Sequence, residues 1–144
     1  MKLPSLKTAL RGNALFSTLC GIDLLLFTDQ ILAVMGNSIP SALLQGLGAL
    51  LIVFAADLLW ISSGNPIKTK FAKMIILMDW AWVISTPVVL VFAWGLLTPM
   101  GVELICIIAA FVALFATLQS KGLQLEQENE GQSQSQQLAQ VTKA

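Results

Sequence analysis

Four acidic side chains interrupt long apolar stretches of this sequence, and they are the residues from which chemistry is most readily expected. They are Asp23, Asp57, Asp79 and Glu103. A carboxylate taken out of water is costly, so such a group is neutralised, hydrogen-bonded or used in function. Two carboxylates held close together can share a proton, which is the chemistry of a proton- or cation-coupled carrier.

Helical spacing predicts which acids share a depth and a face. Counted along a helix, Asp57 and Asp79 fall roughly 8 Å to one side of the middle of their stretches, while Glu103 falls roughly 10 Å to the other side and Asp23 near the middle. Asp57 and Asp79 could therefore meet. Residues that share one face of a helix form a stripe, and the polar or small stripes should point inward. One stripe in each apolar stretch fits this description: Asp23 and Gln30 in the first, Gly46, Val53, Asp57 and Trp60 in the second, Asp79, Trp82 and Thr86 in the third, and Glu103, Cys106, Ala110 and Thr117 in the fourth.

A second interpretation of the acids is structural. Each carboxyl could be protonated, or hydrogen-bonded to a nearby hydroxyl such as Ser17 or Thr86 or to a backbone carbonyl, and so fix how the helices pack. Arg11 and Lys73 could also reach the acids by extending their long side chains. The sequence leaves both interpretations open.

Composition identifies the elements that must position these residues. The chain has 144 residues, of which 56% are apolar and only 11% charged, whereas soluble domains run to about 45–50% apolar and roughly 25% charged. A bilayer core needs ~20 apolar residues per helical span. Four such stretches are present, and we predict spans at residues 12–35, 41–62, 72–97 and 101–120, which excludes an ordinary soluble domain.

Short breaks with turn-forming residues separate the spans, at Gly36 to Pro40, Ser62 to Pro66 and Leu97 to Gly101. Short connections place sequence neighbours side by side and antiparallel. The expected fold is therefore all-α, a four-helix transmembrane bundle built from two helical hairpins. Pro87 lies inside the third span and is expected to kink it.

The distribution of cations predicts orientation. Lysines and arginine stand before the first span, between the second and third, and at Lys121 just after the fourth, but not in the other two loops. The positive-inside rule then places both termini on the cytoplasmic side of the membrane. Asp23 interrupts the first apolar run, so we expect a retained helix and not a cleaved signal peptide.

The chain divides into a membrane domain, residues 1–121, and a polar, Gln-rich tail, residues 122–144. The tail cannot bury enough apolar surface to fold by itself, so we predict that it is disordered, with binding to a partner as the alternative.

Much chemistry is excluded by missing residue types. The sequence has no His, and its two cysteines, Cys20 and Cys106, are predicted to lie on different helices at opposite depths. We therefore expect no catalytic site, no metal site, no cofactor, no disulfide and no nucleic-acid partner.

Trp60 and Trp94 fit the aromatic belts of the two membrane surfaces and are expected to anchor the helices there.

Four segments resemble a group of small bacterial four-helix integral membrane proteins with no assigned activity. They are Asn13 to Ser17, Leu44 to Ala55, Asp79 to Val83 and Ala113 to Gln119. The resemblance covers about residues 11–123, and it implies a bacterial origin and four spans. Its segments are apolar except for Asn13, Asp79, Trp82 and Gln119, and it implies no activity for any residue.

Two functions are expected from these observations. The first is a non-enzymatic accessory or structural membrane component, with the lipid bilayer and a membrane-protein partner or a second copy as its contacts. The second is a small oligomeric transporter coupled to protons or cations, in which Asp79, Asp57 and Asp23 carry the charge; its likeness to small multidrug carriers is one of architecture alone.

Overall fold

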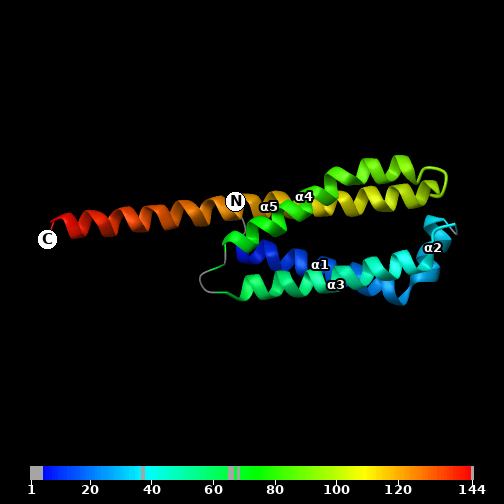
Figure 1. The fold of residues 1–144 in the computed structure, drawn as a ribbon, viewed down its shortest axis with the longest axis horizontal. Coiled ribbons are helices and arrows are strands. Elements are labelled where there is room, and N and C mark those ends of the chain that lie inside the picture. Colours follow the sequence, from blue (N-terminus) through cyan, green and yellow to red (C-terminus); the bar gives the residue numbers. More distant parts are fainter. Residues whose placement is uncertain (1–4, 37, 65–66, 68, 144) are drawn as a thin grey trace.

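The structure is a computed structural model that describes residues 5–36, 38–64, 67 and 69–143, and in this part of the chain all regular structure is helical (Figure 1). Five helices follow one another: α1 (Leu6–Leu26), α2 (Thr28–Met35), α3 (Ser41–Ser63), α4 (Thr69–Phe92) and α5 (Pro99–Lys143). Four of them, α1, α3, α4 and α5, are long and apolar enough to cross a membrane.

The stretch predicted as the first span, residues 12–35, is divided into two helices: α1 begins six residues earlier, at Leu6, and α2 ends at Met35. Ser5 caps α1 by accepting a hydrogen bond from the Thr8 N–H at 3.3 Å, as N-cap serines do. The helix breaks at Phe27, where the Thr28 hydroxyl bonds back to the Leu24 carbonyl, a local bond that competes with the helix ladder. The 21 residues of α1 extend about 31 Å and are long enough to span a bilayer core without α2.

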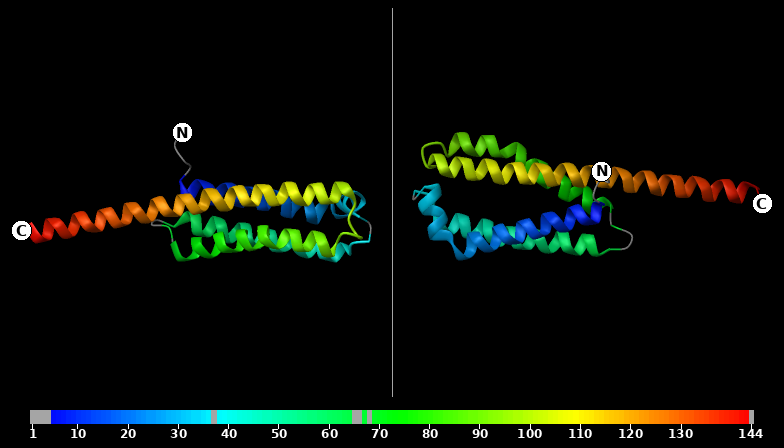
Figure 2. Two further views of the ribbon diagram at one scale, coloured as in Figure 1. Left: turned by 90° about the horizontal axis from the view of Figure 1, so that it is seen from above. Right: turned by 180° about the vertical axis from the view of Figure 1, so that it is seen from behind.

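Within each of the two predicted hairpins, the two long helices lie side by side, as the short breaks predict. The helix α1 packs on α3, α4 packs on α5, and the contact of α1 with α5 joins the two pairs. The helices α3 and α4 barely touch, so the arrangement is more open than the expected closed bundle. The pairs lie close together at the end where α1 begins and diverge toward α2 (Figures 1 and 2).

The end where the two pairs meet carries the packed apolar core and most of the cations. The core is made of Leu6, Leu10, Ala14, Leu58, Ile61, Ile67, Ala72, Ile75 and Leu123. Burial of these side chains is the main force that holds the pairs together here. We call this end the basic end, because Lys7, Arg11, Lys70, Lys73 and Lys121 lie on the helix segments around it.

At the opposite end, a set of hydrogen bonds fastens α2 to the turn between α4 and α5. The Thr98 N–H donates to the Met35 carbonyl at 2.7 Å, the Thr98 hydroxyl donates to the Val34 carbonyl, and the Gly101 N–H donates to the Thr98 hydroxyl at 3.0 Å. Gly36 has a φ of +142°, and a Cβ there would collide with the Leu96 carbonyl. Glycine is therefore required for this close approach.

Replacing Thr98 with valine should loosen this fastening. The change removes the hydroxyl and leaves the Gly101 N–H without its partner, which should cost about 1–2 kcal/mol. Hydrogen exchange should then quicken at the amides of α2. The matched control is Ser85→Ala, because the exposed Ser85 hydroxyl bonds only to the Trp82 carbonyl of its own helix. Unchanged exchange in α2 of the Thr98 variant would contradict this account.

The expected disorder of residues 122–144 is not confirmed, because the structure continues α5 without a break to Lys143 (Figure 1). The tail is rich in Gln, Glu, Leu and Ala, which are good helix formers. Its serine hydroxyls bond to carbonyls four residues earlier, as Ser133 does to Asn129.

Pro87 lies inside α4, which ends at Phe92, five residues before the predicted end at residue 97.

Candidate functional site: a buried carboxyl shared by three helices

Asp79 is buried where α1, α4 and α5 converge, with only 4% of its surface exposed. Two side-chain amides donate hydrogen bonds to the same carboxyl oxygen. Asn13 Nδ2 of α1 lies 2.7 Å from Asp79 Oδ2, and Gln119 Nε2 of α5 lies 3.1 Å from it. One side chain of α4 therefore links the two helix pairs through hydrogen bonds.

The two amides are as deeply buried as the carboxyl. Asn13 is 1% exposed and Gln119 is not exposed at all. The Ser17 hydroxyl, one turn after Asn13, donates to Asn13 Oδ1 at 3.3 Å and holds that amide in place. Gln119 Oε1 is buried and accepts no hydrogen bond within the described structure. We call Asn13, Ser17, Asp79 and Gln119 the polar node.

The polar node lies close to the basic end, yet among the described residues no cation is a hydrogen-bond partner of Asp79. Asp79 follows Lys73 by six residues, which is about 9 Å along the helix, and Gln119 precedes Lys121 by two residues, about 3 Å. The side chains of Lys73, Lys121 and Arg11 are exposed. The buried carboxyl is thus bound by neutral amides, and the expected reach of Arg11 or Lys73 to the acids is not seen.

The expected meeting of Asp57 with Asp79 is wrong. Asp57 is exposed on the outer side of α3, whereas Asp79 is enclosed by α1 and α5. The predicted inward stripe on α3 also points outward, since Gly46, Val53 and Trp60 are exposed. The inner face of α3 consists instead of its buried residues, which are Leu44, Gly48, Ala55, Leu58, Ile61 and Ser62.

The other predicted acids also remain outside the interior. Asp23 of α1 and Glu103 of α5 are exposed, and so are Gln30, Cys106 and Ala110 of their predicted stripes. The predicted stripe of Asp79, Trp82 and Thr86 points inward at two of its three positions, because Thr86 is buried with Asp79 while Trp82 is 40% exposed. The structure therefore brings Asp79 together with amides and not with another acid.

The predicted anchors Trp60 and Trp94 both lie on the outside of the helices, with 54% and 73% of their surfaces exposed. Trp60 packs edge-on against Phe71 at a ring-centre distance of 5.6 Å. Exposed indoles at opposite ends of long apolar helices agree with an anchoring role at two membrane surfaces.

Sequence reasoning did not choose Asn13 and Gln119 as site residues. Both are polar residues in otherwise apolar segments, which is the signal that could have identified them. Their spacing gave no indication, because 66 and 40 residues separate them from Asp79. Only the packing of α1, α4 and α5 in the structure shows that both amides reach Asp79.

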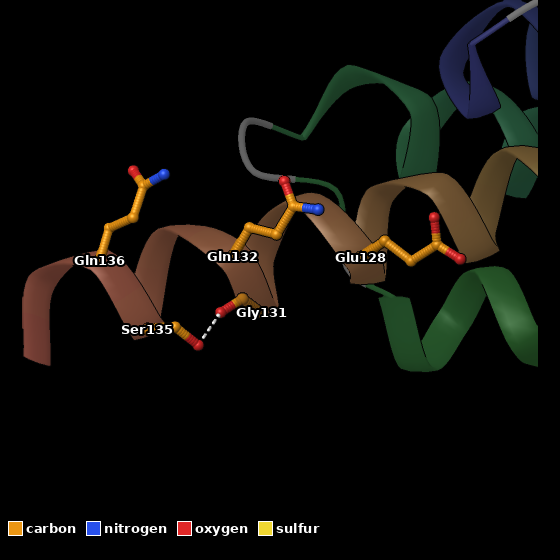
Figure 3. A pocket seen from close by; sticks show the side chains of 5 residues that line it. All are labelled: Glu128, Gly131, Gln132, Ser135 and Gln136. Carbon is orange, nitrogen blue, oxygen red and sulfur yellow. Dashed lines mark hydrogen bonds between the residues drawn. The ribbon is translucent and has the colours of Figure 1, made fainter. Parts of the chain in front are cut away.

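The described residues contain no group of three His, Cys, Asp or Glu side chains that could hold a metal ion. A hollow lies along the tail, where Figure 3 shows Glu128, Gln132 and Gln136 on a single helix. All five lining residues belong to α5, so we assign the hollow no ligand.

No protein-family model, curated protein or solved structure matches this chain. The resemblance to small bacterial membrane proteins therefore stays a prediction. Any function has to be argued from the helices and the polar node themselves.

Proposed function

We propose that this chain is a non-enzymatic accessory component of a membrane, which binds a partner membrane protein through the outer faces of its helices. Four helices long and apolar enough to cross a bilayer support the membrane location. The exposed side chains on these helices include many large apolar ones, such as Leu50, Ile84 and Val91. Lipid or another membrane protein is the natural environment for such surfaces.

The proposal extends to topology. The helices would form a four-span assembly in a bacterial cytoplasmic membrane, with the basic end in the cytoplasm. The cations at the starts of α1 and α4 and after the apolar part of α5 support this orientation, because Lys and Arg are retained on the cytoplasmic side. The helical tail of α5 would then extend into the cytoplasm.

One observation supports an accessory protein over a carrier: three of the four candidate acids, Asp23, Asp57 and Glu103, are exposed, whereas Asp79 is buried. A carrier that moves protons between carboxylates needs acids within reach of one another. Asp23, Asp57 and Glu103 are exposed on different helices, and none of them hydrogen-bonds to Asp79. In the interior a single acid bound by amides fixes the packing of three helices, which is a structural role.

The outer face of α3 is the surface that we propose for the partner. Asp57 lies on it with the exposed residues Ala42, Gly46 and Val53. A Cβ at Gly46 would meet nothing within 4 Å. Small residues let another helix approach closely, and an outward carboxylate next to lipid gains from a partner that satisfies it.

Site-specific photocrosslinking tests the proposed surface. A photoreactive residue at position 53, on the face of Asp57, should give one discrete protein adduct in native membranes. The adduct should weaken in an Asp57→Leu background. The control position is Ile75, which is 2% exposed and should give no intermolecular adduct. Lipid adducts alone at position 53, or a protein adduct that does not depend on Asp57, would contradict the proposal.

A further inference from the structure

The polar node contains a hydrogen-bonding mismatch that its own amides do not resolve. Both amide donors bind Asp79 Oδ2, at 2.7 Å and 3.1 Å. In the described structure Gln119 Oε1, on a side chain with no exposed surface, accepts nothing. A buried acceptor without a donor is destabilising, so the node is one donor short.

The missing donor has to be found among the groups that pack around the node. From α1 the node receives Asn13, whose Nδ2 donates to Asp79 Oδ2, and Ser17, whose hydroxyl donates to Asn13 Oδ1; in the described structure neither donates to Gln119 Oε1. Thr86, buried on α4, donates to the Trp82 carbonyl. The nearby charged groups Arg11, Asp57, Lys73 and Lys121 are exposed. These side chains leave the need of Gln119 Oε1 unmet.

A proton on Asp79 supplies that donor. A carboxylic acid and a carboxamide can join through two hydrogen bonds, in which the amide N–H binds one carboxyl oxygen and the acid O–H binds the amide oxygen. The first of these bonds is present between Gln119 Nε2 and Asp79 Oδ2. The second requires Oδ1 of Asp79 to carry a proton.

We propose that Asp79 and Gln119 form a proton-binding site in which the neutral acid donates from Oδ1 to Gln119 Oε1. The same proton removes the charge from a carboxyl that is enclosed by three helices and has no cation as a partner. The folded chain therefore holds one proton between α4 and α5. This inference concerns the interior of the protein and does not depend on the proposed partner surface.

Infrared spectroscopy of the full chain in lipid at neutral pH tests the site, with ¹³C-labelled aspartate to identify Asp bands. We expect a protonated-carboxyl band that shifts with the label and is absent from Asp79→Asn. That variant should fold, since its amide can both donate to Gln119 Oε1 and accept from Gln119 Nε2. The matched control Asp57→Asn should leave the band unchanged. In Gln119→Leu the band should move to higher frequency, because the acid loses hydrogen bonds.

The result that would overturn the proposal is a wild-type spectrum at neutral pH with only ionised aspartate bands. If those bands also changed when sodium chloride is replaced by choline chloride, a sodium ion and not a proton would be the occupant. A protonated band that persists in Asp79→Asn would belong to another acid and would equally overturn it.

Discussion

Replacing Asp79 with alanine should lower the free energy of unfolding by about 2–4 kcal/mol, since a buried donor left unpaired costs about 1–3 kcal/mol. Without the carboxyl, Asn13 Nδ2 and Gln119 Nε2 lose the acceptor that they share. The link between α4 and α1 is lost at the same time. Unfolding in mixed detergent, followed by circular dichroism, measures the change.

The control for this experiment is Asp79→Asn, which keeps the shape of the side chain and one acceptor oxygen. Its free energy of unfolding should stay within about 1 kcal/mol of the wild type, the usual net value of one hydrogen bond. Equal stability of the alanine variant and the wild type would show that the polar node does not hold the helices together.

Replacing Gly48 with leucine should lower the free energy of unfolding about as much as Asp79→Ala does, because the larger side chain does not fit between the helices. A Cβ at Gly48 would lie 2.9 Å from the Gly21 carbonyl oxygen and 3.0 Å from side-chain atoms of Leu24 and Leu25. A larger side chain must push α3 away from α1. Overpacking of a close contact costs typically about 1–3 kcal/mol and occasionally more, and we expect the upper part of that range.

Gly46 offers a matched control two residues away on the same helix. A Cβ there meets nothing within 4 Å, so Gly46→Leu should leave the free energy of unfolding unchanged or raise it by up to about 1 kcal/mol through better helix propensity. The same detergent unfolding experiment compares the two variants. A loss at Gly46 equal to that at Gly48 would mean that both faces of α3 are packed within the chain.

The positions of the membrane helices follow from apolar length, and here the sequence was informative. The predicted second span, residues 41–62, differs from α3, Ser41–Ser63, by one residue. The break at Phe27 was missed because no proline or glycine marks it. Length alone could not separate α1 from α2, because both are apolar.

The direction in which polar residues point was harder to predict. The expectation that polar stripes face inward holds for Asp79 and Thr86, whereas Asp57 points outward. The α3 stripe includes the small Gly46 and the polar Asp57, yet Gly48 on the other face makes the close contact with Gly21. Helix periodicity defines a face but does not say which neighbour that face meets.

The tail shows the difference between tertiary and local stability. Its composition excludes a buried core, and most of its side chains from residue 124 onward are exposed. A helix that has already formed can still propagate at little cost, because nucleation is the expensive step. The apolar part of α5 supplies that nucleus. Gly122 and Leu123 still pack against the start of α1 and the core, and from residue 124 onward the helix continues although nearly all of its described side chains are exposed.

The mass of the intact complex tests the accessory role most directly. The protein should be extracted gently from its native membrane and measured by native mass spectrometry together with an Asp57→Leu variant. We predict a wild-type complex that contains a second protein in fixed stoichiometry, and loss of that protein from the variant. A wild-type mass that corresponds only to one or more copies of this chain would contradict the accessory role.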